Sequence, residues 1–192
     1  MLTIEHLTKR FDDTEIFTGL CLTVERPVVL WAPSGWGKTT LLRILMGLEP
    51  PTAGRVQGAG RVAAVFQEDR LCPQLNAIQN VTLVLPGAEN QYIQQITEDF
   101  QQLGMDKTVL CLPARKLSGG QKRRTALLRA VWAPSDTVVL DEPFTGMDPD
   151  TMERAAALLN QRCTGKPALL ATHDRDAIRA LGWPVIELEK MG

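Results

Sequence analysis

The chain has 192 residues, of which 44% are hydrophobic and 22% are charged, and its formal net charge is −1. These values lie near the averages of globular proteins and exclude a disordered or fibrous chain. The charge balance gives no overall attraction to nucleic acid or anionic lipid, so we expect one folded domain over residues 1–192 with a sizeable core.

The sequence shows neither a membrane-spanning segment nor a cysteine-based metal or redox site. No stretch reaches the run of about 18 apolar residues that a membrane-spanning helix needs, so any membrane role must come from a partner chain. The four cysteines, at positions 21, 72, 111 and 163, are too scattered for a zinc site or a redox pair. Reduced thiols in a cytoplasm are the favoured interpretation.

The first predicted elements are two strands and a strand–loop–helix unit. Residues 2–7 and 20–24 alternate apolar and polar side chains, which predicts a small antiparallel layer. Residues 27–31 form an apolar run that leads into a glycine-rich turn and a helix over 39–48.

The middle of the chain is predicted to be helical after one further strand. Residues 62–66 have the composition of a short strand. Residues 76–85 and 91–103 have apolar spacing compatible with helices, interrupted by Pro86 and Gly87.

The last third of the chain alternates helices with strands. Helices are expected over 121–131 and 149–159, and strands over 137–140, 168–171 and 185–188. This alternation predicts an α/β fold with a mostly parallel sheet flanked by helices.

The same pattern predicts how the domain is divided. Residues 76–115 are expected to form a helical subdomain. It would be inserted into a core made of residues 1–75, which include the antiparallel β layer, and residues 116–192.

A phosphate-binding loop is predicted between the strand at 27–31 and the helix that follows it. The motif has the P-loop spacing, with Ala32 where the usual pattern begins with glycine. Gly35 and Gly37 let backbone N–H groups surround phosphate oxygens at a helix start. The residues expected to contact a nucleotide are Ala32, Pro33, Ser34, Gly35, Trp36, Gly37, Lys38, Thr39 and Thr40.

Individual members of this loop have separate expected roles. Lys38 would reach the β- and γ-phosphates, and the Thr39 hydroxyl suits a magnesium ion that keeps phosphate and water oxygens as its other ligands. An ordinary glycine turn followed by a helix is the alternative. Trp36 is bulky for its position, and it would pack against a partner chain or cover the loop.

A second glycine-rich helix start follows at Leu117-Ser118-Gly119-Gly120-Gln121. Its backbone N–H groups offer another anion site, although Ser118 would also serve as a helix N-cap that needs no ligand. With this motif the sequence resembles the ATP-binding-cassette (ABC) family, whose signature is LSGGQ, from about Leu2 to Leu188.

The resemblance implies a P-loop NTPase core whose cofactors are ATP and Mg²⁺. It also implies that two such cassettes close head to tail, most simply as a homodimer. The signature residues Ser118, Gly119, Gly120 and Gln121 would then contact the ATP held by the other subunit.

Family resemblance also assigns roles to three polar residues near predicted strand ends. Asp141 would support magnesium directly or through water, while Glu142 would polarise the attacking water. Gln67, in the text FQED, would contact magnesium and water and sense the membrane partner. A solvated strand end is the alternative for the two acids.

Three further residues correspond to family positions. His173 corresponds to the switch histidine that contacts the γ-phosphate, although a lone histidine after a strand is often structural. Asp148 lies in the loop that meets the opposite subunit. Phe11 has the position of the aromatic that stacks on adenine, with a core phenylalanine as the alternative.

The basic group Lys122, Arg123 and Arg124 is interpreted as a solvated helix face, because the neutral net charge argues against a nucleic-acid patch. No nucleic-acid partner is therefore expected.

These observations favour an ATPase that powers a membrane transporter. The expected partners are transmembrane permease subunits and an extracytoplasmic substrate-binding protein, and the expected location is the inner face of the cell membrane. The text from Phe66 to Leu71 looks most like bacterial importers of the nitrate, sulfonate and taurine group. The alternative is a soluble cassette ATPase that acts on DNA, ribosomes or cofactor assembly. A non-hydrolysing binding module is disfavoured by the four polar residues Lys38, Asp141, Glu142 and His173.

Overall fold

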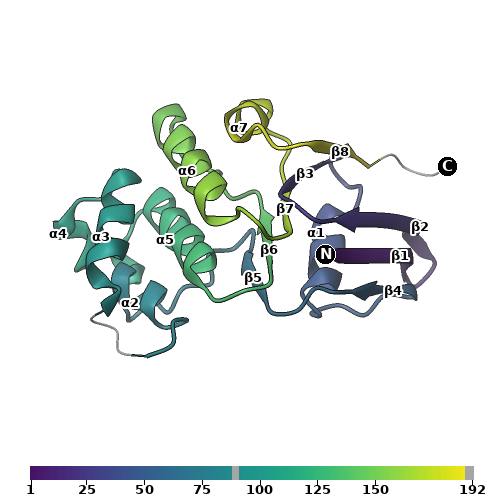
Figure 1. Cartoon of the computed structure of the whole chain (residues 1–192), viewed down its shortest axis with the longest axis horizontal. Helices are drawn as coiled ribbons and strands as arrows, with labels where there is room; N and C mark the ends of the chain where they lie inside the picture. The colour runs from purple at the N-terminus through teal and green to yellow at the C-terminus, as the bar shows by residue number, and fades with distance from the viewer. Residues whose placement is uncertain (88–90, 189–192) are drawn as a thin grey trace.

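A five-stranded sheet lies at the centre of the structure, a computed structural model that describes residues 1–87 and 91–188 (Figure 1). The strand order is β5-β6-β7-β3-β8, and neighbouring strands run parallel. The strands are β3 (Val28–Trp31), β5 (Val62–Val65), β6 (Thr137–Asp141), β7 (Ala168–Ala171) and β8 (Val185–Glu187). β6 and β7 are buried throughout, as expected for central strands covered on both faces. The predicted parallel sheet is confirmed.

A second, antiparallel sheet lies beside it, at the right of Figure 1. It contains β1 (Leu2–Phe11), β2 (Thr14–Val24) and β4 (Ala53–Gln57) in the order β2-β1-β4. The small antiparallel layer is therefore confirmed, but β1 and β2 are longer than predicted and β4 was not predicted at all.

Irregular backbone explains why these strands were underestimated. In β1 the buried positions change phase after His6, which has a φ of 47° at a shift in the pairing with β2, so the alternation of apolar residues stops at Leu7. In β2 a glycine, Gly19, interrupts the pattern with a φ of 63°. Only Val56 of β4 is partly buried, so this edge strand has no apolar alternation to detect.

Four helices pack around the parallel sheet: α1 (Lys38–Leu45), α5 (Gly119–Trp132), α6 (Pro149–Arg162) and α7 (Arg175–Leu181). In Figure 1, α1 lies between the two sheets, whereas α5 and α6 lie on the other side of β5 and β6. The predicted helix over 121–131 begins two residues earlier than expected, since Ser118 caps it. The seven-residue α7 was not predicted because only Ala177 and Leu181 of it are buried.

Short helices occupy the range predicted for the helical subdomain. They are α2 (Ala77–Thr82), α3 (Ile93–Gln102), α4 (Lys107–Leu110) and a 3₁₀ turn at Ala114–Lys116. α4 was not predicted, because four residues are too few for a helical period. Residues 88–90 and 189–192, which belong to the predicted subdomain and core ranges, lie outside the described residues.

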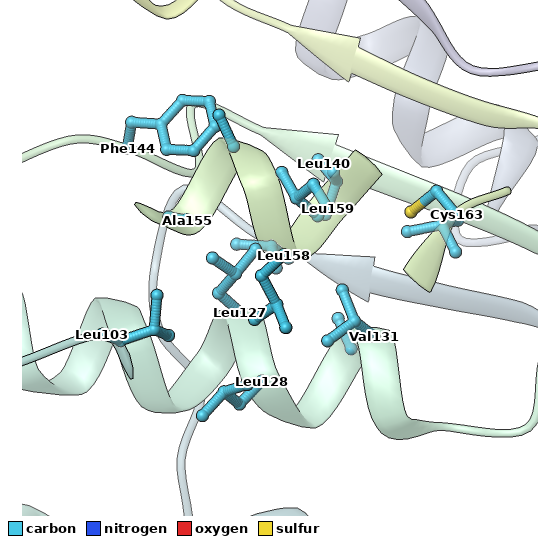
Figure 2. Packing of buried hydrophobic residues seen from close by; sticks show 14 of the residues in the cluster. Leu103, Leu127, Leu128, Val131, Leu140, Phe144, Ala155, Leu158, Leu159 and Cys163 are labelled. Carbon is cyan, nitrogen blue, oxygen red and sulfur yellow. The ribbon is translucent and has the colours of Figure 1, made fainter. Parts of the chain in front are cut away.

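The core beneath α5 and α6 is closely packed with aliphatic side chains. Figure 2 shows Leu127 of α5 beside Leu158 of α6, and Leu159 of α6 beside Leu140 of β6; Val131 and Cys163 belong to the same cluster. Burial raises the pKa of the Cys163 thiol to about 11, so this cysteine behaves as an inert apolar residue. Within the described ranges, every helix lacks either the length or the apolar content needed to span a bilayer.

Candidate functional site

A cavity of about 580 Å³ lies where polar residues follow the carboxyl ends of β3, β5, β6 and β7. Ligands of open parallel sheets bind at this edge. The cavity is lined by Ile16, Ser34, Gly35, Trp36, Gly37, Lys38, Thr39, Thr40, Gln67, Asp141, Glu142 and His173. The structure thus brings together most of the phosphate loop with the glutamine, both acids and the histidine that the sequence singled out.

The phosphate loop connects β3 to α1 through two glycines in left-handed conformations. Gly35 has a φ of 79° and Gly37 has a φ of 105°. A β-carbon at Gly37 would also collide with Ile16 Cγ2 of β2, so glycine is needed there for space as well as for conformation. No side chain caps the start of α1, where Gly37 is the N-cap residue and lines the cavity. Its first backbone N–H groups are therefore suited to an anion.

The Lys38 ammonium lies back over its own loop. Its Nζ donates to the carbonyl oxygen of Ala32 at 2.6 Å and to that of Pro33 at 3.2 Å. Ala32 and Pro33 do not line the cavity. They contribute to the site through their carbonyl oxygens, which bind the Lys38 ammonium. Lys38 is a mobile type of side chain that can turn from carbonyl oxygens to phosphate oxygens.

Trp36 packs against the antiparallel sheet. Its side chain is 3% exposed, and its ring stacks on Phe17 of β2 with a centroid distance of 5.4 Å and an interplanar angle of 11°. Of the two roles considered from the sequence, covering the loop is the one that the structure supports.

Thr39 and Asp141 are hydrogen-bonded to each other in the lining of the cavity. The Thr39 hydroxyl donates to Asp141 Oδ2 at 2.8 Å. Burial raises the pKa of the Asp141 carboxyl, against the opposing effect of the Thr39 hydrogen bond; the Glu142 charge raises it further, and the Lys38 and Arg123 charges lower it. The site therefore contains a carboxylate whose negative charge is poorly compensated by the surrounding protein.

This donor set fits magnesium. Thr39, Asp141 and Gln67 line one cavity, and their side chains carry the hard oxygen atoms that Mg²⁺ prefers. The described part of the chain holds no cluster of three or more acidic, histidine or cysteine ligands. A site with few protein ligands suits an ion that keeps water and phosphate oxygens.

Glu142 faces a different set of partners from its neighbour Asp141. Its Oε2 accepts a hydrogen bond from the Thr172 hydroxyl at 2.8 Å, and its Oε1 lies 2.7 Å from His173 Nδ1 and 3.2 Å from the His173 backbone nitrogen. Glu142 has a φ of 47°, a conformation that costs a non-glycine residue energy. The two adjacent acids therefore serve different parts of the cavity.

The signature residues lie outside this cavity. Ser118 caps α5: its Oγ accepts from the Gln121 backbone N–H at 3.3 Å, and the Gln121 side chain accepts from the Ser118 N–H at 2.9 Å. The N-cap is the structural role considered for Ser118 from the sequence, and the reciprocal bond to the Gln121 side chain completes a capping box that was not predicted. Ser118 and Gly119 are exposed, so an additional role toward a second cassette stays a prediction.

Asp148 and Phe11 also lie away from the cavity lining. Asp148 caps α6 and accepts hydrogen bonds from the Thr151 hydroxyl at 2.7 Å and the Thr151 N–H at 2.9 Å. These bonds lower the pKa of its carboxyl. The Phe11 ring is 43% exposed and carries the Lys9 ammonium 4.3 Å from its centroid. Adenine stacking on Phe11 therefore stays a prediction, and a core role is excluded by its exposure.

The interpretation of Lys122, Arg123 and Arg124 as a solvated face is wrong for Arg123. Arg123 is 6% exposed, and its guanidinium donates to the carbonyl oxygens of Phe66 and Gln67. Lys122 and Arg124 are half-buried. Arg124 donates to the carbonyl oxygen of Leu103 at 2.9 Å. Burial of Arg123 depends on a segment more than fifty positions away in sequence, which local charge patterning does not reveal.

Two residues of the site were missed from the sequence. Ile16 reaches the cavity from β2, and no motif marks it. Thr172 is buried, and its hydroxyl joins Glu142 to the start of α7 by accepting from the Asp174 N–H at 3.1 Å. Thr172 could have been identified from the sequence, because its hydroxyl follows the apolar run 168–171 and precedes His173.

Comparison with known proteins finds one family model and relatives that are named as ATP-binding proteins of importers. The family described as ABC transporter matches residues 19–145. The aliphatic sulfonates import ATP-binding protein SsuB 1 of Nocardia farcinica is 38% identical, over 98% of this chain and 78% of that protein. The Fe(3+) ions import ATP-binding protein FbpC of Brucella abortus is 34% identical, over 100% of this chain and 59% of that protein. The chain thus spans about three fifths of the latter relative.

Solved structures give the same result for the fold. A dimeric bacterial ABC transporter cassette superposes with a TM-score of 0.82 at 25% sequence identity, covering 98% of this chain and 94% of that chain. A dimeric ATP-binding cassette in a post-hydrolysis state with ADP and Pi has a TM-score of 0.81 at 24% identity, with coverage of 98% and 94%. The second likeness supports the fold alone.

Proposed function

The chain belongs to the ABC transporter family, and on that premise we propose that it is the ATP-binding and ATP-hydrolysing subunit of a bacterial membrane importer. The supporting observation is that Lys38, Thr39, Asp141, Glu142 and His173 line one cavity. The relatives described above are named as import subunits for different substrates, so the shared property is ATP-driven import. This favours transport over the alternative of a soluble cassette ATPase.

In this proposal the phosphate loop binds the triphosphate of ATP. Gly35, Gly37 and Thr40 surround the phosphates through the start of α1, and Lys38 exchanges its carbonyl partners for β- and γ-phosphate oxygens. Phe11, which is 43% exposed, would stack on the adenine ring. Thr39, Asp141 and Gln67 would hold Mg²⁺, which supplies neutralisation of phosphate charge when bound.

Hydrolysis is assigned to the opposite side of the cavity. Glu142 is proposed to orient and polarise the attacking water, and His173 to contact the γ-phosphate. The 2.7 Å approach of His173 Nδ1 to Glu142 Oε1 supports this pairing, because it places both groups at one point of the cavity. No covalent intermediate on the protein is required.

The remaining predicted residues are assigned to partners. Ser118, Gly119, Gly120 and Gln121 would complete the ATP site of a second cassette, and Asp148 would meet that cassette nearby. The helices of the proposed subdomain, residues 76–115, would transmit motion to transmembrane permease subunits at the cytoplasmic face of the membrane. An extracytoplasmic protein would deliver the substrate to the permease.

The test of this function is Glu142→Gln. We expect the variant to retain ATP affinity and to form an ATP-dependent dimer in light scattering, while ATP turnover falls by at least about 100-fold, as loss of a general base predicts. Glu153→Gln is a matched control, since Glu153 is exposed on α6, and it should hydrolyse ATP at the normal rate. Normal turnover by Glu142→Gln would remove Glu142 from the proposed role.

A further inference from the structure

The segment that carries Gln67 lies outside helices and strands and is held by two arginines of α5. Arg123 donates through Nη1 to the Phe66 carbonyl at 2.5 Å and through Nη2 to the Gln67 carbonyl at 2.6 Å. Arg129 donates to the carbonyls of Arg70 at 2.8 Å and Asp69 at 3.2 Å. Two guanidinium groups thus bind the backbone at four of five consecutive residues.

Arg123 is suited to hold this backbone firmly. A guanidinium presents its N–H groups in a planar fork, so one side chain can bind two adjacent carbonyls in a fixed geometry. Charge-assisted hydrogen bonds are shorter and stronger than neutral ones. Arg123 is also 6% exposed and lies 3.4 Å from Asp69 Oδ1, which keeps its charge compensated away from water.

Arg123 contacts the nucleotide cavity indirectly, through the backbone of a residue that lines it. Gln67 lines the cavity together with Thr39 and Asp141, and its backbone carbonyl is bound by Arg123. Arg123 therefore fixes the backbone from which one of the proposed magnesium ligands projects, without lining the cavity itself.

We propose that Arg123 is a positioning residue that sets the placement of Gln67 in the cavity and thereby the magnesium requirement of the site. This inference rests on the function proposed above. Because Arg123 lies in the helix capped by Ser118, it ties the Gln67 segment to the same rigid element that carries the signature residues.

The experiment compares Arg123→Gln with Arg129→Gln in the full chain. Both variants remove one guanidinium of α5 that binds two carbonyls, but only Arg123 binds the Gln67 carbonyl. Three quantities are measured: the Mg²⁺ concentration for half-maximal ATP hydrolysis, the ATP affinity in EDTA, and hydrogen–deuterium exchange of the backbone over 66–70 without nucleotide.

For Arg123→Gln we expect the half-maximal Mg²⁺ concentration to rise about tenfold, because removing a group that holds a metal ligand in place weakens metal binding. Exchange over 66–68 should be faster, and ATP affinity in EDTA should be unchanged. Arg129→Gln should retain the magnesium requirement of the unmodified chain. A purely structural role would change stability without this selective shift.

Two results would overturn the proposal: an unchanged magnesium requirement in Arg123→Gln, or an equal shift in Arg129→Gln. If Arg123→Gln does not fold, Arg123→Lys takes its place, because it retains the charge but has no planar fork for two carbonyls. It should shift the magnesium requirement in the same direction, and no shift would again overturn the proposal. Failure of the proposed function is distinct, since the unmodified chain would then show no magnesium-dependent ATP hydrolysis.

Discussion

The two glycine-rich helix starts of this chain differ in how they use their hydrogen-bonding groups. The start of α1 has no side-chain cap and lines a cavity with Asp141 and Glu142. The start of α5 is closed by the Ser118–Gln121 capping box, lies outside that cavity and is exposed at Ser118 and Gly119. The first loop lines a cavity within its own chain, whereas the second is closed by its own cap and exposed, as the proposed contact with a second cassette requires.

The strongest test of this contrast is complementation between two inactive variants. Lys38→Ala and Ser118→Asp should each lose nearly all ATP turnover, because the first lacks the phosphate lysine and the second puts a negative charge against the neighbour's phosphates. In a symmetric dimer, an equimolar mixture should recover about a quarter of normal turnover, since half of the dimers are mixed and each has one intact site.

Steady-state turnover of the mixture checks this expectation after the two proteins have been allowed to exchange subunits. Mixing Lys38→Ala with unmodified protein controls for exchange itself. A mixture as inactive as its components would show that the Ser118 loop does not complete a neighbour's site.

A second test separates the capping role of Ser118 from its proposed ligand role. Ser118→Ala removes the cap and should lower the free energy of unfolding by about 1 kcal/mol, whereas Ser118→Asp retains a good cap and should keep normal stability. Urea unfolding measures both. If Ser118→Asp keeps its stability and still forms the ATP-dependent dimer, the ligand role of this loop is wrong.

The smallest expected effect concerns two carboxyls with opposite pKa shifts. Burial raises the pKa of Asp141 in the folded state, so its favourable contribution to stability is present below the unfolded-state pKa and is lost as pH rises through the folded-state value. Asp141→Asn should therefore raise the melting temperature at pH 7 without Mg²⁺. The gain should disappear as pH falls toward the ordinary carboxyl range.

Asp148 supplies the matched comparison of opposite sign. Hydrogen bonds from Thr151 lower its pKa, so its contribution is present above the unfolded-state pKa and is lost as pH falls through the folded-state value. Asp148→Ala should lower the melting temperature at pH 7 and have less effect in acid. Equal signs for the two variants in thermal melts across pH would contradict this account of the two regions.

Prediction from sequence succeeded where residues that act together are close in the chain. The residues from Ser34 to Thr40, and the pair Asp141 and Glu142, follow apolar runs directly, and parallel strands bring their carboxyl ends to one edge. The strand phase in β1 was not predictable, because the irregularity near His6 reverses which residues face the core.

Long-range contacts explain the remaining differences. Burial of Arg123 is decided by carbonyls of a distant segment, and the placement of Trp36 is decided by Phe17 on another strand. Neither partner can be identified from local pattern. The signature loop lies between these cases, since the N-cap could be predicted from Ser118, while the proposed ligand belongs to another molecule.

The support that β2 gives to the phosphate loop has a thermodynamic consequence. Because Trp36 is stacked on Phe17 and Gly37 packs against Ile16, the loop has already given up its conformational entropy when the chain folds. The entropy cost of ordering the site on nucleotide binding then falls on side chains such as Lys38. This lysine must break its hydrogen bonds to two carbonyl oxygens before it can bind phosphate. Preorganisation of this kind makes the antiparallel sheet a contributor to affinity even though only Ile16 of it lines the cavity.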